Sequence, residues 1–186
     1  MAQRMPRQIN VGPRQKKLRG IPRRLRALKT WASRFDGYFP SQEELHGQRY
    51  WNWKIPVHWG LVEGRYTNSE IQKECAQSLI NACSALIKAK PEWASAYRVT
   101  CSICIPDMFT SELCIYLDEP YYQSHTAPLK TKYGHQELIE GRSLAAEWGR
   151  SLPSHVKEKG VIWCYNASEG GDDHYVSQHW VYGEVS

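Results

Sequence analysis

The sequence lacks any long apolar run, and it lacks acidic residues near its start. No stretch approaches the roughly 18 apolar residues of a membrane-spanning helix. Residues 1–30 carry charges throughout and contain no apolar segment of the kind found in a secretion signal. Pro and Gly recur there and disfavour the continuous amphipathic helix of a mitochondrial presequence. These absences predict a cytoplasmic protein that does not enter a membrane.

Recognisable catalytic motifs are also missing. The sequence contains no GxSxG, P-loop or HExxH pattern. Its one CxxC, from Cys101 to Cys104, has no second pair to complete a four-ligand zinc site, and residues three apart on a strand point to opposite faces. All six cysteines lie in apolar stretches, which predicts reduced and buried thiols. We therefore expect no metal, no cofactor and no catalytic residues.

Two histidine patterns have a catalytic interpretation and a structural one. His58 follows a tryptophan-rich stretch, but no neighbour in sequence supplies a nucleophile or an orienting carboxylate. Asp172 and Asp173, with His174 and His179, imitate a metal or acid–base cluster, but Gly-Gly-Asp-Asp is also typical of a hairpin turn. We favour the turn, with an acidic tip that could contact a basic partner.

Aromatic residues are abundant, and the charge is unevenly distributed. The chain has 8 Trp and 11 Tyr against only 3 Phe, and Trp and Tyr suit both half-buried sheets and binding surfaces. Eleven Lys and Arg precede Asp36 without one acid, which leaves 13 basic and 19 acidic residues and a net charge of −6 for the rest. This division predicts a flexible basic arm over residues 1–20 and one folded domain over residues 21–186.

Apolar periodicity predicts three helices. A stripe at helical spacing runs through residues 22–35, with Pro22 suited to the first turn. The clearest helix spans residues 68–90, where Thr67 and Glu70 form a capping box and Pro91 stops the helix. A weaker helix is predicted over residues 136–150.

Alternation at period two predicts the strands. Residues 50–59 place three Trp on one face, and Pro56 marks this strand as an edge strand or as its end. A hairpin is predicted over residues 98–117, and a second joins residues 160–166 to 174–183. Together these elements predict a single α+β domain with an antiparallel sheet of about five strands and about three helices packed on it.

Several short motifs are similar to those of an uncharacterised bacterial domain-of-unknown-function family. They are Leu18-Arg-Gly-Ile-Pro-Arg-Arg-Leu-Arg26, Tyr38-Phe-Pro40, Ile55-Pro-Val57, Lys90-Pro91, Tyr97-Arg-Val99, Ile105-Pro-Asp-Met-Phe109 with Ser111, and His179-Trp180-x-x-Gly183-Glu184. The resemblance is good over residues 18–118 and poor over residues 119–172. It implies a bacterial, cytoplasmic, single-domain protein, and it brings no established activity or catalytic residues.

We expect from this a non-catalytic protein-binding module, and specifically an immunity protein that neutralises a cognate bacterial toxin by direct binding. Its contacts would be aromatic and acidic residues of the second hairpin: Trp163, Tyr165, Asp172, Asp173, Tyr175 and Trp180. The first alternative is nucleic-acid binding through the arm and the first helix, by Arg14, Lys16, Lys17, Arg19, Arg23, Arg24 and Arg26. The second is an enzyme with a pocket near His58.

Overall fold

A computed structural model describes residues 20–56, 69–105, 111–117, 134–138, 143–150, 152–166 and 174–184, and the backbone alone for residues 105, 134–138, 159–166 and 174–179. In chain order the elements are α1 (Ile21–Ser33), α2 (Gln42–Leu45), β1 (Tyr50–Lys54), α3 (Ser69–Ala89), the 3-10 turn η3 (Glu92–Ala94), β2 (Tyr97–Ile105), β3 (Glu112–Leu117), β4 (Gly134–Leu138), α5 (Leu144–Glu147), β5 (Lys157–Asn166) and β6 (His174–Gly183).

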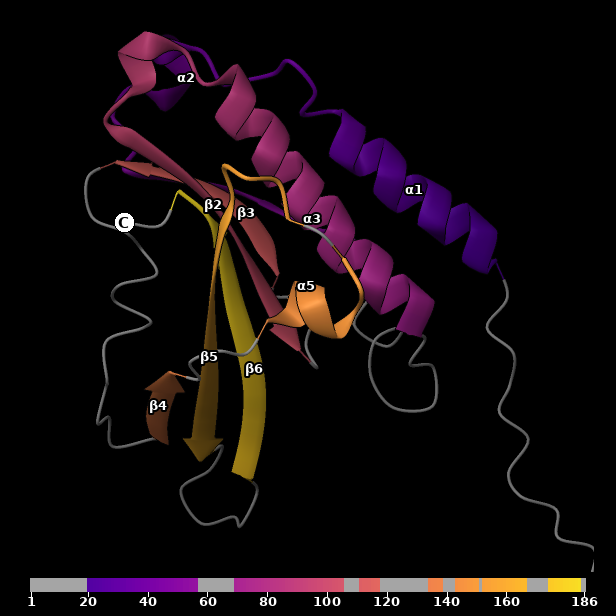
Figure 1. Ribbon diagram of the computed structural model, residues 1–186. Helices are drawn as coiled ribbons and strands as arrows, with labels where there is room; N and C mark the ends of the chain where they lie inside the picture. Colours follow the sequence, from indigo (N-terminus) through magenta and orange to yellow (C-terminus); the bar gives the residue numbers. More distant parts are fainter. Residues whose placement is uncertain are drawn as a thin grey trace, which may run out of the picture.

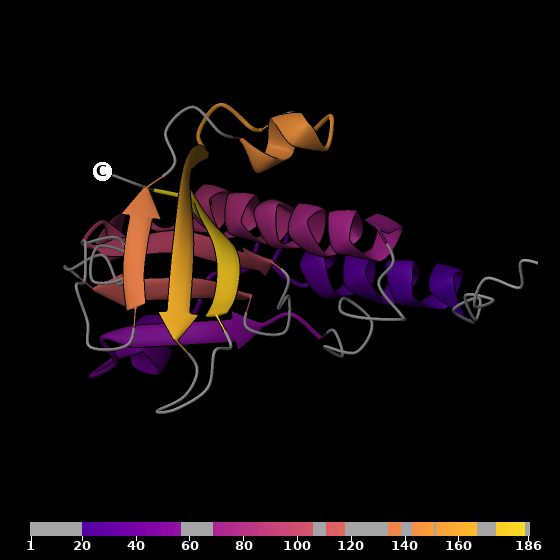
Figure 2. The same ribbon diagram turned by 90° about the horizontal axis from the view of Figure 1, so that it is seen from below.

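The six strands form one antiparallel sheet in the order β1-β3-β2-β6-β5-β4. Strand β1 lies at one edge of the sheet, as Pro56 predicts, and its Trp51 pairs with Ile115 of β3. The α+β class is confirmed. In both views the β4–β5–β6 strands run in a different direction from the β1–β3–β2 strands, so the sheet is strongly twisted (Figures 1 and 2).

Helix α3 packs on β2, β3 and β6, and α1 packs beside α3 (Figure 1). The predicted apolar stripes face this interface: Leu28 and Trp31 of α1 and Cys75, Leu79 and Leu86 of α3 are all buried. None of the described helices is long and apolar enough to cross a membrane.

The main core fills the space between the helices and the sheet. It is rich in aromatic residues, with Phe35 contacting Trp31, Tyr38 and Trp53 edge-on at ring-centroid distances of 5.2, 6.4 and 5.3 Å. Edge-to-face geometry of this kind is the favoured arrangement of aromatic pairs. Much of the aromatic excess of the first half of the chain therefore stabilises the fold.

The helix predicted over residues 136–150 is wrong. Gly134–Leu138 forms β4, which pairs with Val161–Tyr165 of β5, and among the described residues of this range Leu144–Glu147 alone is helical. Pairing with a strand far along the chain overrides a weak local helical pattern. Ser143 caps the short helix by accepting a hydrogen bond from the Ala146 N–H.

The β5–β6 hairpin extends beyond the helices. Strand β6 pairs with β2 only through Gln178–Gly183, whereas residues 174–177 pair, among the described strands, with β5 alone. Figure 1 shows this half of β5 and β6, with β4 beside it, projecting past α1, α3 and α5. The domain thus consists of a helix-covered half and a projecting three-stranded half.

Candidate functional site

The residues predicted to contact a partner fall mainly on the projecting half of the hairpin. Tyr165 pairs directly with Tyr175, and Trp163 lies two residues along β5. Asp172 and Asp173 fall between the two strands and lie outside the described residues. The fold therefore brings Trp163, Tyr165 and Tyr175 to one end of the sheet, as the hairpin prediction requires.

Trp180 does not belong to this set. Its side chain is 2 % exposed and lies in the core between the sheet and the helices. Strand β6 passes from the projecting half of the sheet into the covered half near Gln178, where β2 begins to pair with it. A residue beyond this point is buried by the protein itself, so the prediction that Trp180 contacts a partner is wrong.

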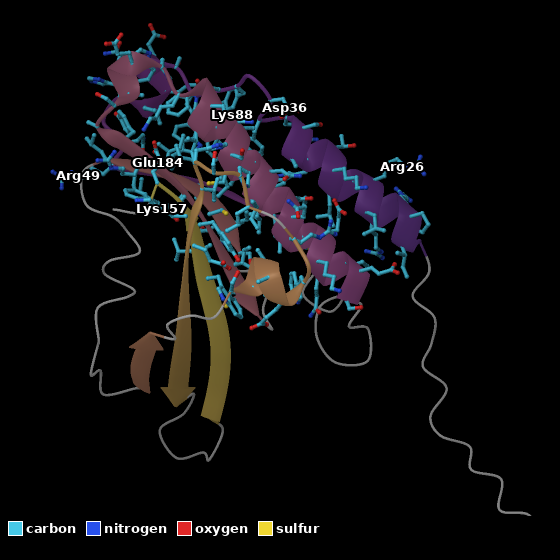
Figure 3. All side chains as sticks on the ribbon, viewed as in Figure 1. Arg26, Asp36, Arg49, Lys88, Lys157 and Glu184 are labelled. Atoms are coloured by element: carbon cyan, nitrogen blue, oxygen red, sulfur yellow. The ribbon has the colours of Figure 1, made fainter. Side chains whose placement is uncertain are left out.

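The predicted anion-binding residues divide between the arm and α1. Arg14, Lys16, Lys17 and Arg19 lie outside the described residues. Arg23, Arg24 and Arg26 are exposed on α1, and Arg26 points away from the body of the protein (Figure 3). The ion pairs within the described part of the chain are Lys29–Glu74 and Lys90–Glu184, so these three guanidinium groups are not paired there with an acid.

The histidines and cysteines that the sequence suggested as reactive groups do not form a cluster within the described part of the chain. His58 lies outside the described residues, and only the backbone is described for His174 and His179. Cys101 is buried in the main core, Cys104 is half-buried, and neither forms a disulfide bond. Among the described residues no group of three potential metal ligands occurs.

A buried carboxylate that the sequence patterns did not reveal lies on the face of the sheet opposite to α3. Glu112 is 8 % exposed, and its two oxygens accept hydrogen bonds from the Tyr50 hydroxyl and the Asn52 amide. The Tyr50 hydroxyl is also 3.2 Å from the Cys114 sulfur. We call these four residues the Glu112 centre. A buried charge is tolerated only where it is hydrogen-bonded, and this carboxylate is.

The pKa values of Tyr50 and Cys114 determine how reactive the Glu112 centre is. Burial raises the pKa of the Tyr50 phenol above its ordinary value, and the neighbouring Cys114 and Glu112 raise it further. Burial also raises the pKa of the Cys114 thiol, with Glu112 as the next cause. Both groups stay protonated at neutral pH, and a protonated thiol is a poor nucleophile. The centre therefore joins the edge strand β1 to β3 through hydrogen bonds.

A second acid, which is half-buried, holds the end of β6. Glu184 forms an ion pair with Lys90 and accepts a hydrogen bond of 2.9 Å from the Val99 N–H, while its own N–H donates to the Val99 carbonyl at 3.0 Å. Beside it, Gly183 has a φ of 127°, and a Cβ there would lie 2.3 Å from the Val99 oxygen. Only glycine fits so close an approach. We call Lys90, Val99, Gly183 and Glu184 the C-terminal clamp.

A third acid, Glu158, attaches α5 to the sheet. Its carboxylate accepts hydrogen bonds from the Ser143 hydroxyl, the Leu144 N–H and the Tyr182 hydroxyl. Burial raises the pKa of Tyr182, and the bond to Glu158 raises it further. An acid at a helix N-terminus satisfies free N–H groups and favours the helix dipole.

Comparison with protein families gives one match. A model of the family described as a protein of unknown function (DUF3916) covers residues 29–184. The chain belongs to the DUF3916 family. The match includes residues 119–172, where the resemblance read from the sequence is poor, and it begins after the Leu18–Arg26 motif. Comparison with curated proteins and with solved structures finds no match.

Several of the short motifs singled out in the sequence have a structural explanation. Lys90 and the closing Gly183-Glu184 form the C-terminal clamp. Ser111 is fully buried, and its Oγ accepts a hydrogen bond of 2.9 Å from the Cys104 N–H while its carbonyl accepts one of 3.2 Å from the Ile55 N–H. These residues therefore stabilise the sheet.

Proposed function

We propose that this DUF3916 protein is a protein-binding module whose β5–β6 hairpin docks on a cationic partner, and that the partner is a toxin domain which the module neutralises. The observation that carries the proposal is the projection of this hairpin beyond the helices (Figure 1). The backbones of β5 and β6 are already hydrogen-bonded to each other in the projecting half, which reduces the conformational freedom that binding a partner would cost.

Charge favours a cationic partner. From residue 160 to residue 186 the chain has no Lys or Arg, and it has four acids: Glu169, Asp172, Asp173 and Glu184. Glu184 is already paired with Lys90 in the C-terminal clamp. The other three acids lie in the connection between β5 and β6 and would accelerate association with a basic surface.

Aromatic residues of the hairpin support a protein partner. Trp and Tyr are among the residues that most often dominate binding energy at protein interfaces. Tyr165 and Tyr175 are paired across the projecting half of the hairpin, and Trp163 is close to them on β5. The neutralisation of a toxin rests on analogy with small binding proteins, and binding can be tested independently of it.

The test is co-purification with the products of neighbouring genes, followed by titration calorimetry with the one that is retained. We expect a Kd in the micromolar range or tighter. Replacing Asp172→Lys and Asp173→Lys together should weaken binding by about tenfold or more and reduce its dependence on salt. The matched control is Glu43→Lys with Glu70→Lys, which makes the same change of charge at two exposed positions on α2 and α3.

Two results would contradict the proposal. One is the absence of any partner of micromolar affinity among the neighbouring gene products. The other is equal weakening by the control pair, because this would show that overall charge, rather than the hairpin, drives association. Co-expression with a retained toxin domain then separates binding from neutralisation, since only the latter restores growth.

Nucleic-acid binding is a second candidate, because α1 presents Arg23, Arg24 and Arg26 exposed and without an acidic partner in the described part of the chain. Deleting residues 1–20, or replacing the three arginines by Gln, should abolish retention of a 20-nucleotide RNA or DNA and reduce the salt dependence of its binding. Unchanged fluorescence anisotropy would reject this candidate.

A further inference from the structure

A polar cavity of about 440 Å³ lies between α1 and α3, and Pro153 contributes to its lining. Its volume is within the range of roughly 300–1,000 Å³ that is typical of ligand sites. The cavity belongs to the helical layer, whereas the proposed partner surface is on the projecting hairpin. A ligand of this cavity would therefore be independent of the proposed function.

Both walls of the cavity carry one basic and one acidic side chain. Lys29 of α1 and Asp36 of the turn after it line one wall, and Lys88 and Glu74 of α3 line the other. Lys29 and Glu74 lie 4.0 Å apart at one end. Asp36 and Lys88 are found together near the other end of the two helices (Figure 3), and neither makes an ion pair with a described residue. These four charges cancel, and a lining with no net charge disfavours both a polyanion and a polycation.

One polar side chain of the lining has no partner among the described residues. Ser78 is 1 % exposed, and its Oγ makes no hydrogen bond within that part of the chain. Ser84, on the same helix, is hydrogen-bonded to His155 Nε2 at 2.9 Å. The Ser78 Oγ has almost no accessible surface, so Ser78 forms part of the wall of the cavity and the charged side chains are the groups that a ligand can reach.

We propose that this cavity binds an extended peptide segment that carries a basic side chain next to an acidic one. The basic group pairs with Asp36 and the acidic group with Lys88. No aromatic side chain of the described residues lines the cavity, so stacking of a base or a sugar ring is not indicated there. From Glu74 to Lys88 the α3 wall is about 21 Å long at ~1.5 Å per residue, the length of about six extended residues.

The test is an NMR titration of the ¹⁵N-labelled protein with Ac-Lys-Glu-Ser-Gly-Ser-Gly-NH₂, with Ac-Gln-Gln-Ser-Gly-Ser-Gly-NH₂ as the neutral control peptide. We expect the charged peptide to shift the amide resonances of Ser78, Asn81 and Lys88 in a saturable manner. The neutral peptide should bind about fivefold more weakly or worse, because it loses both charged contacts.

Three variants locate the site. Lys88→Gln and Asp36→Asn should each weaken peptide binding by about fivefold or more, while Lys73→Gln, on α3 but outside the cavity, should change it by less than about twofold. Unchanged affinity in Lys88→Gln or Asp36→Asn, equal weakening by Lys73→Gln, or no saturable shift at about 5 mM peptide would overturn the proposal.

Discussion

Removing the carboxylate of Glu184 tests whether the C-terminal clamp stabilises the fold. The Lys90 and Glu184 side chains are 15 % and 20 % exposed, so the ion pair is largely shielded from water. In Glu184→Ala the Lys90 ammonium retains the Tyr97 carbonyl at 3.3 Å as a partner, and the Val99 N–H loses its acceptor.

The size of the effect follows from these contacts. A hydrogen bond to a charged group contributes about 1.5–3 kcal/mol, and removing one partner of a buried ion pair costs about 3–5 kcal/mol. Because both side chains keep some contact with water, we expect Glu184→Ala to lower the free energy of unfolding by about 2–4 kcal/mol. For a chain of this size each kcal/mol lowers Tm by roughly 2–4 °C.

Urea unfolding followed by circular dichroism measures this loss. The control is Glu92→Ala, an exposed acid in η3, which should change stability by less than about 0.5 kcal/mol. A double-mutant cycle with Lys90→Met and Glu184→Gln should give a coupling energy of at least about 1 kcal/mol. A loss in Glu184→Ala no larger than that of the control would refute the reasoning.

Three further predictions concern the sheet and its thiols. Gly183→Ala should destabilise by more than about 2 kcal/mol because its Cβ would meet the Val99 carbonyl, and a Tm within about 2 °C of the native protein would contradict this. Glu112→Gln places an amide donor near the Asn52 amide and should cost about 1–3 kcal/mol, measured by urea unfolding; no loss would mean that the carboxylate is dispensable. Burial raises the pKa of Cys75 to about 12, so the unfolded state loses this proton first and stability should fall as the pH rises from about 9 to 12. Thermal melts should show a weaker decline in Cys75→Ala, and an identical decline would exclude this thiol as a cause.

Those elements that carry a strong local pattern could be predicted from the sequence. The alternating tryptophans identify β1, and the apolar stripe identifies α3 to within one residue at each end. Pro56 correctly indicates an edge strand. By contrast, β4 has no clear alternation and exists because β5 pairs with it. The short α2 was missed although its Ser41 and Glu44 form a capping box, because a four-residue helix has no periodicity to detect.

The partners of the acidic residues Glu112 and Glu184 could not be predicted in the same way. Asn52 and Glu112 are 60 residues apart in the sequence, and Lys90 and Glu184 are 94 apart. An acid in a strand is normally taken as a solvent-exposed residue, and only the three-dimensional fold shows which partner satisfies it. The prediction for Trp180 was wrong for a related reason. Strand β6 passes from the projecting half of the sheet into the helix-covered half, and its sequence pattern does not change at that point.

The strand order has a consequence for biosynthesis. Strand β6 is the last of the six to emerge from the ribosome, yet it occupies an interior position between β2 and β5. Until it is made, the nascent protein holds two separate groups of strands, β1-β3-β2 and β5-β4, whose inner edges are both open. The complete sheet can therefore form only after β6 has been made, and a product truncated before β6 would be prone to aggregation through those edges.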